Sequence, residues 1–137
     1  MCKGDGMNKV FLGGTCAETT WREELMAVLQ VAYFNPVVDD WTPECQANEE
    51  AEKRDRCNIH LYVITKEMMG VFSIAEAIES AHNHNKNTIL HVMPDGFDEG
   101  QLKSLRAVVE MVRKHGGIGY VDDDLLRTVR VINYSFK

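Results

Sequence analysis

The segment from Gly70 to Ile78 carries one glutamate, Glu76, among small and apolar residues. Helical spacing places this carboxylate in the first turns of a helix that follows an apolar strand. The positive end of a helix favours the ionised form of a carboxylate, and an ionised, partly desolvated carboxylate can attack a sugar carbon. Glu76 is therefore the candidate nucleophile. The alternative is an exposed glutamate on an amphipathic helix.

Two further segments have residue types that suit ligand binding. Gly13-Gly14-Thr15 follows a short apolar strand, and its backbone can approach a ligand closely and offer amides to an anion. The alternative is a tight turn between a strand and a helix. Trp41, next to Asp40, can stack on a flat ring such as a base, or simply pack against the end of a strand.

Short apolar runs alternate with segments of helical period along the chain. Strands are expected over residues 9–12, 33–38, 59–64, 88–93 and 118–121, and the second is expected to begin after Pro36. Helices are expected from Thr20, which with Glu23 has the spacing of a capping box, over residues 44–57, 71–83 and 98–114, and from Asp122 onward.

Five strands, each followed by a helix, predict an α/β fold. The expected architecture is a flavodoxin-like, Rossmann-like doubly wound sheet of five parallel strands in the order 2-1-3-4-5, with helices on both faces. Residues 1–7 are expected to form a flexible tail and residues 8–137 a single domain. Ligands of such sheets bind beyond the carboxyl ends of the strands, where strands 1 and 3 are neighbours. Residues 13–15, 39–41 and 65–76 are therefore expected to face one crevice.

Charge and composition exclude several classes of function. The 137 residues carry 15 Lys and Arg against 21 Asp and Glu, a net charge of -6, which is unsuited to binding a nucleic-acid backbone. No apolar run approaches the roughly 20 residues of a membrane-spanning helix. The N-terminal sequence lacks the apolar region of a signal peptide, so a soluble, cytoplasmic protein is expected.

Histidines and cysteines are not spaced as in a metal site. His82 and His84 are two residues apart, so they point to different sides of a helix, and the four cysteines contain no C-x-x-C pair. The better interpretation of these histidines is a polar helix end. We expect no metal and no cofactor.

Three stretches of the chain resemble the nucleoside 2-deoxyribosyltransferase-like superfamily, and in particular its small bacterial and phage branch. These are Val10 to Gly14, then Phe34 to Val38 with Asp40 and Trp41, and finally Leu61 to Thr65 followed by Gly70 to Ala77. The resemblance spans roughly Lys9 to Val92. It implies an enzyme that cleaves or transfers at the N-glycosidic bond of a nucleoside or nucleoside monophosphate.

The resemblance also implies roles for individual residues. Glu76 matches the nucleophilic glutamate, which attacks the anomeric carbon and forms a glycosyl-enzyme intermediate, as in a retaining glycosidase. Gly13, Gly14, Thr15, Gly70 and Ser73 would hold the sugar or a 5′ phosphate, and Trp41 would contact the base. Glu50, next to Glu49, falls near the carboxylate that contacts the base. Family members assemble as dimers or larger, so a homo-oligomer is expected.

One departure concerns the acid that protonates the leaving base. The family usually carries an aspartate at the end of strand 3 or in the loop after it, where this chain has Thr65-Lys66-Glu67-Met68-Met69-Gly70. Glu67 or Asp40 can take that place. Two other functions remain open: a nucleotide-binding module without catalysis, and an NAD-glycohydrolase-like activity.

The distribution of acidic residues gives a weak indication of the substrate class. Seven of the 21 acidic residues lie between Asp39 and Asp55, in segments expected to border the crevice. An acidic crevice suits a neutral nucleoside better than a substrate with several phosphates.

Overall fold

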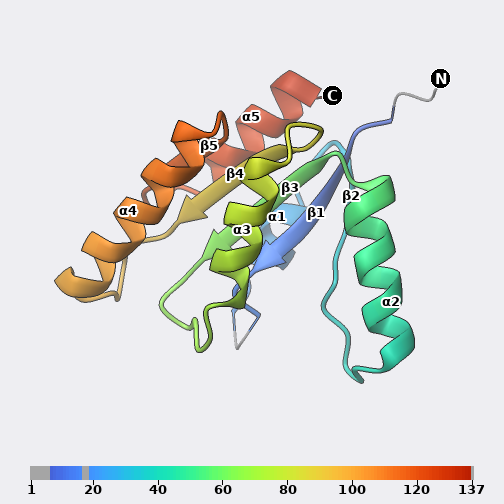
Figure 1. Cartoon of the computed structure of the whole chain (residues 1–137), viewed down its shortest axis with the longest axis horizontal. Coiled ribbons are helices and arrows are strands. Elements are labelled where there is room, and N and C mark those ends of the chain that lie inside the picture. Colours follow the sequence, from blue (N-terminus) through green and yellow to red (C-terminus); the bar gives the residue numbers. More distant parts are fainter. Residues whose placement is uncertain (1–6, 17–18, 137) are drawn as a thin grey trace.

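The computed structural model describes residues 7–16 and 19–136. The tail expected over residues 1–7 lies outside this part of the chain except for Met7. The described residues form a five-stranded sheet in the order β2-β1-β3-β4-β5, and every neighbouring pair of strands is parallel. Figure 1 shows this sheet with its helices. The predicted doubly wound α/β fold and strand order are confirmed.

The strands lie close to the predicted positions, with one exception. They are β1 (Lys9–Gly14), β2 (Ala32–Phe34), β3 (Ile59–Ile64), β4 (Asn87–Val92) and β5 (Ile118–Val121). The prediction that the second strand begins after Pro36 is wrong, because β2 ends before it. Pro36 has no N–H to donate to a neighbouring strand, and the next amide, of Val37, bonds the side-chain oxygen of Asn35 at 3.1 Å. This turn leads the chain out of the sheet.

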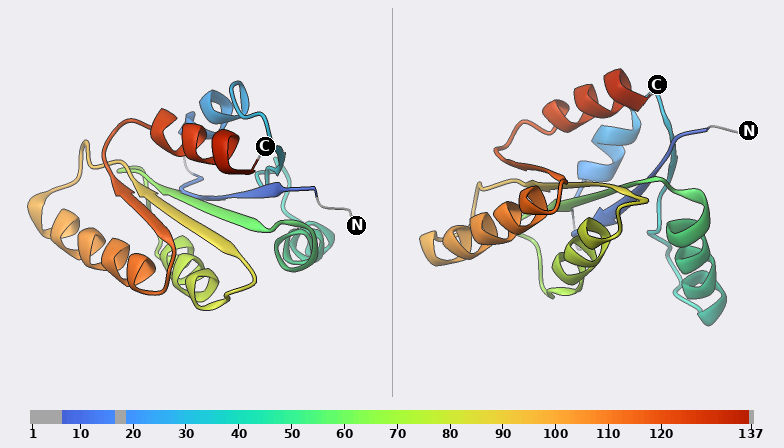
Figure 2. Two further views of the ribbon diagram at one scale, coloured as in Figure 1. Left: turned by 90° about the horizontal axis from the view of Figure 1, so that it is seen from above. Right: turned by 45° about the horizontal axis from the view of Figure 1, so that its top comes forward.

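Helices cover both faces of the sheet. They are α1 (Trp21–Met26), α2 (Pro43–Ala51), the π-helical turn η1 (Glu52–Arg56), α3 (Phe72–His82), α4 (Glu99–Lys114) and α5 (Leu126–Phe136). Figure 2 shows α1 and α5 on one face, and α2, α3 and α4 on the other. The right-handed crossovers of parallel strands produce this arrangement.

A separate apolar core lies on each face. Leu12, Leu61 and Ile89 of the sheet pack with Trp21 of α1 and Ile132 of α5. On the other face the sheet residues pack against α3 and α4, and the fully buried members include Phe11, Tyr62, Leu90, Ala77 and Val112. Because β3 and β4 bury side chains on both faces, their sequences are nearly continuous apolar runs.

Two helix starts differ from the predictions. Thr20 precedes α1 without a side-chain cap, so the predicted capping box is wrong. Helix α1 ends at Met26. Helix α5 begins at Leu126 rather than at Asp122. Asp122 instead accepts the amide of Asp124 at 3.0 Å and an Arg127 N–H at 2.9 Å, which holds it in the loop. No helix of the described residues is long and apolar enough to cross a membrane.

Candidate active site

A cavity of about 550 Å³ lies at the carboxyl ends of β1 and β3. This volume is typical of a small-molecule site. The cavity is bordered by the end of β1, the loop before α2, the loop after β3 and the first turns of α3. Eight of the ten predicted site residues line it: Gly13, Gly14, Thr15, Trp41, Glu67, Gly70, Ser73 and Glu76. Asp40 and Glu50 are not among the lining residues.

Side chains of α1 donate hydrogen bonds to the backbone at the end of β1. Arg22, only 4% exposed, donates to the carbonyl oxygens of Leu12 at 3.0 Å, Thr15 at 2.7 Å and Gly14 at 3.3 Å. The indole N–H of Trp21 also donates to Thr15, at 2.9 Å. A guanidinium offers several donors in a rigid plane, so one side chain satisfies the carbonyls that the strand leaves unpaired where it ends.

The two glycines let β1 and β3 approach closely. Gly14 has φ +115, in the region that favours glycine, and a side chain on Gly13 would lie 2.6 Å from the Tyr62 ring. The next amide, of Thr15, donates to the Val63 carbonyl at 2.9 Å. Gly13, Gly14 and Thr15 therefore line the cavity mainly as a smooth backbone wall, and the Thr15 amide is engaged within the protein.

Glu76 lies on α3 and forms a close ion pair with Lys53 of η1. The Lys53 Nζ is 2.6 Å from Glu76 Oε2, and both side chains are 11% exposed. The Lys53 ammonium also lies 5.7 Å from the centre of the Phe11 ring. Burial by itself lowers the pKa of Lys53, but the hydrogen bond and charge of Glu76 outweigh it, and the pKa is raised overall.

Glu49 and Glu50 of α2 have different environments. Glu49 lines the same cavity as Glu76. Burial raises the pKa of Glu49, and the negative charge of Glu76 raises it further. The side chain of Glu50 is 51% exposed and lies 3.4 Å from Lys53 Nζ. It lines a second, smaller cavity of about 240 Å³, which Lys53 and Glu76 also line.

The other two predicted acids also differ in position. Glu67, in the loop after β3, lines the main cavity, and the Thr65 hydroxyl donates to its carboxylate at 2.7 Å. Asp40 is exposed, and its backbone carbonyl faces the Cys45 thiol at 3.8 Å. Among the described lining residues there are three carboxylates, of Glu49, Glu67 and Glu76, and one guanidinium, of Arg22.

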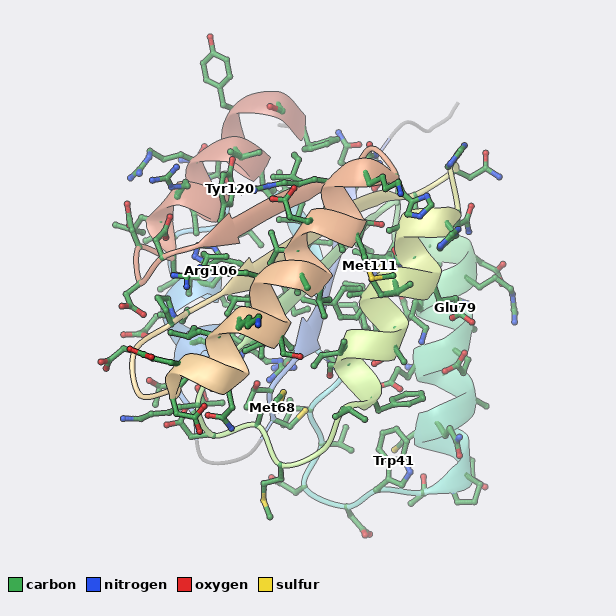
Figure 3. The ribbon with its side chains drawn as sticks, turned by 60° about the vertical axis from the view of Figure 1, so that its left-hand side comes forward. Trp41, Met68, Glu79, Arg106, Met111 and Tyr120 are labelled. Carbon is green, nitrogen blue, oxygen red and sulfur yellow. The ribbon has the colours of Figure 1, made fainter. Side chains whose placement is uncertain are left out.

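Exposed apolar side chains form the rim of the cavity. Trp41 is 54% exposed, Phe72 is 71% and Met69 is 92%, and all three line the cavity. Figure 3 shows Trp41 before α2, at the same end of the molecule as Met68 of the loop after β3. Flat apolar groups beside an acidic interior suit a ligand with one aromatic part and one polar part.

Sequence reasoning did not select Lys53, Arg22 or Phe72, and it named Glu49 only as a neighbour of Glu50. A polar helix such as α2 buries no residue, so its sequence has no apolar stripe that shows which side faces the cavity. One feature of the sequence could have indicated Arg22. It directly follows Trp21 in the first turn of a helix whose other face is apolar.

Within residues 7–16 and 19–136 no three His, Cys, Asp or Glu side chains are grouped in a way that could hold a metal ion. His82 lies in the last turn of α3, and its ring is 3.9 Å from that of His115. These rings lie at the opposite end of the strands from Glu76.

Comparison with known proteins assigns the family. No curated protein matches the chain. The profile of the family described as nucleoside 2-deoxyribosyltransferase like matches residues 7–97. That range extends from the start of β1 to beyond β4 and contains every residue of the candidate site. The chain therefore belongs to the nucleoside 2-deoxyribosyltransferase-like family.

Proposed function

We propose that the protein cleaves the N-glycosidic bond of a nucleoside or nucleoside monophosphate, with Glu76 as the nucleophile and Glu49 as the proton donor to the leaving base. The observation that carries this proposal is the pair itself. Two carboxylates from different helices line one cavity. That of Glu76 is paired with the Lys53 ammonium, whereas burial raises the pKa of Glu49. Such a pair is typical of sites that combine a nucleophile with a general acid.

Glu76 has the environment that a nucleophile needs. Its carboxylate is largely withdrawn from solvent and pairs with the Lys53 ammonium, the kind of partner that a buried charge requires. Attack by one oxygen on the anomeric carbon forms a glycosyl ester and breaks the bond from that carbon to the base. The electron pair of that bond moves to the base nitrogen, which takes a proton as it leaves.

Glu49 is the best placed source of that proton. Its raised pKa keeps the carboxylic acid protonated to higher pH than an ordinary glutamate, as a general acid requires. Glu67 is the second candidate, because it lines the same cavity and the Thr65 hydroxyl orients it. In the second half of the reaction, the carboxylate left on Glu49 takes a proton from the attacking water or from the N–H of an acceptor base.

The rim and the charge of the cavity indicate the substrate class. Trp41 and Phe72 offer flat surfaces for a base, and Ser73 and the backbone of Gly70 lie where a sugar can be held. Three carboxylates against one guanidinium disfavour a chain of phosphates. The substrate is therefore a nucleoside or its monophosphate. The proposal includes no cofactor or metal, and it takes the protein to be a soluble, cytoplasmic homo-oligomer.

The test is chromatography of deoxynucleosides, their monophosphates and NAD after incubation with the protein. We expect free base from a deoxynucleoside or a monophosphate, and none with Glu76→Gln. Base exchange in the presence of a second base would identify transfer rather than hydrolysis. Thermal stabilisation by these ligands without any release of base would show a binding module instead. Release of nicotinamide would indicate an NAD-glycohydrolase-like activity.

A further inference from the structure

The ammonium of Lys53 lines the smaller cavity and contacts the carboxylate on which the proposed chemistry depends. Lys53 Nζ is 2.6 Å from Glu76 Oε2. Glu76 lines both the main cavity and the smaller one that contains Lys53. Among the described residues, no hydrogen bond or ion pair reaches Glu76 Oε1. Within residues 7–16 and 19–136, one oxygen of Glu76 is thus held and the other has no polar partner.

Lys53 occupies an unusual backbone position. It lies in η1, where the Cys57 amide donates to the Glu52 carbonyl at 2.8 Å, five residues back. Such π-helical turns are rare and occur often at functional sites. The wider turn leaves backbone carbonyls without their usual partners. Lys86 Nζ binds those of Arg54 at 2.6 Å and Cys57 at 2.9 Å.

His60 of β3 binds a further carbonyl of η1, that of Lys53 itself. The His60 Nε2 lies 2.8 Å from the Lys53 carbonyl oxygen. A carbonyl only accepts, so Nε2 carries the proton and Nδ1 accepts from the Ser80 hydroxyl, 2.9 Å away. Ser80 Oγ in turn is 2.6 Å from Thr88 Oγ1. A buried chain of hydrogen bonds therefore connects β4, α3 and β3 to the backbone of Lys53.

Lys53 is surrounded on several sides. Glu76 of α3 and Glu49 and Glu50 of α2 are the charged groups that face it, and Phe11 and Tyr62 of the sheet lie nearby. Burial and the charge of Glu76 raise the pKa of Tyr62, so Tyr62 stays neutral. Lys53 therefore supplies a positive charge that faces all three of these carboxylates.

We propose that Lys53 is a positioning residue. Its hydrogen bond to Glu76 Oε2 orients the carboxylate so that Oε1 points toward the anomeric carbon of the substrate. This inference rests on the proposed function. A carboxylate fixed by one oxygen loses little freedom on reaching the transition state. The same ammonium then helps Glu76 to leave. When water or the nitrogen of an acceptor base attacks, the bond from carbon to Oε1 breaks and the negative charge returns next to Lys53.

The first measurement is independent of turnover. The ¹³Cε resonance of Lys53, assigned with Lys53→Arg, is titrated by NMR in the unmodified protein and in Glu76→Gln. Glu50 remains beside the ammonium in this variant, but the charge and hydrogen bond of Glu76 are the stronger influences that oppose burial. The titration midpoint of Lys53 is therefore expected to fall by about one pH unit or more. An unchanged midpoint would overturn the inference, whatever the activity.

The second measurement separates positioning from folding. Lys53→Met is expected to lower kcat about a hundredfold with little change in KM, and Lys53→Arg to restore part of kcat. Lys103→Met, on the exposed side of α4, serves as the control and is expected to leave kcat unchanged. Wild-type kcat in a folded Lys53→Met variant would overturn the positioning role. Absence of base release from the unmodified protein would overturn the proposed function, and the catalytic purpose of the pair with it, while the titration would still report the contact.

Discussion

Glu49 of α2 and Glu76 of α3 line the same cavity, and the charge of Glu76 contributes to the raised pKa of Glu49. The two residues come from helices that are separated in sequence by β3, and the parallel crossover brings their inner faces together above the ends of β1 and β3. This relationship gives one site a carboxylate that is paired with an ammonium and a second carboxyl group whose pKa is raised.

Replacing Glu49 by glutamine removes the proposed proton donor. We expect Glu49→Gln to lower kcat/KM for a deoxynucleoside about a hundredfold, and far less for a 4-nitrophenyl deoxyriboside, whose leaving group needs no proton. The decline of activity at alkaline pH is also expected to weaken, because it reflects loss of the Glu49 proton. These expectations are tested by measuring steady-state rates with both substrates over a range of pH.

The neighbouring carboxylate decides whether the effect belongs to Glu49. Glu50 is half exposed and outside the main cavity, so Glu50→Gln is expected to change kcat/KM by less than about threefold. Equal losses in both variants, or equal sensitivity of both substrates to Glu49→Gln, would argue against Glu49 as the acid and would direct attention to Glu67.

Trp41 is expected to contribute to binding rather than to chemistry. Stacking on a base gains about 1–3 kcal/mol, so Trp41→Ala is expected to raise KM about tenfold with little change in kcat. Trp41→Phe is expected to retain most of the affinity. The control is Tyr134→Ala, on α5 and 94% exposed, which removes an aromatic ring on the other face of the sheet. A loss in kcat alone would contradict the stacking role.

Arg22 is expected to support the fold beneath the site. Arg22→Met leaves carbonyls of Leu12, Gly14 and Thr15 with fewer donors in a buried position. Each such loss costs about 1–3 kcal/mol, so we expect the free energy of unfolding to fall by about 3 kcal/mol. Urea denaturation measures it. Arg130→Met, at an exposed ion pair, should change it by less than about 0.5 kcal/mol. Similar small effects in both variants would contradict the account of Arg22.

The lowered pKa of His60 predicts how the free energy of unfolding depends on pH. Burial lowers its pKa from 6.5 to about 4, so the unfolded chain binds a proton on His60 before the native protein does. The stabilisation is present above about pH 6.5 and is lost as the pH falls toward about 4, at a cost of about 3 kcal/mol. Urea unfolding at about pH 7 and about pH 4.5 measures the loss.

The comparison for this prediction is His60→Gln, which retains a donor for the Lys53 carbonyl but has no titrating ring. We expect this variant to lose about 2 kcal/mol less than the unmodified protein over the same pH interval. Parallel losses in the two proteins would show that other groups cause the pH dependence.

Much of the fold is predictable because buried parallel strands have a distinctive sequence. The run Ile59–Ile64 matches β3 residue for residue, since a strand buried on both faces must be apolar throughout. The second strand was misplaced because Val37 and Val38 have high strand propensity. Pro36 and the turn at Asn35 outweigh that propensity, and these valines border the cavity instead.

The site was only partly predictable, for a geometric reason. Glu76 stands out because the residues around it, from Gly70 to Ile78, are otherwise small or apolar, so a carboxylate there has few explanations. Helix α2 has polar residues all round, and successive residues on a helix point about 100° apart. Its sequence therefore cannot show that Glu49 rather than Glu50 faces the cavity. The π turn at Lys53 has no sequence signal of comparable strength.

The central claim is covalent catalysis by Glu76, and the direct measurement is mass spectrometry of acid-quenched protein during turnover of a deoxynucleoside. We predict a transient adduct with the mass of one deoxyribosyl group, mapped by peptide fragmentation to Glu76 and absent in Glu76→Gln. Glu79→Gln, one turn further along α3 and exposed, should still form it. Release of base without an adduct, or an adduct on another carboxylate, would contradict the claim.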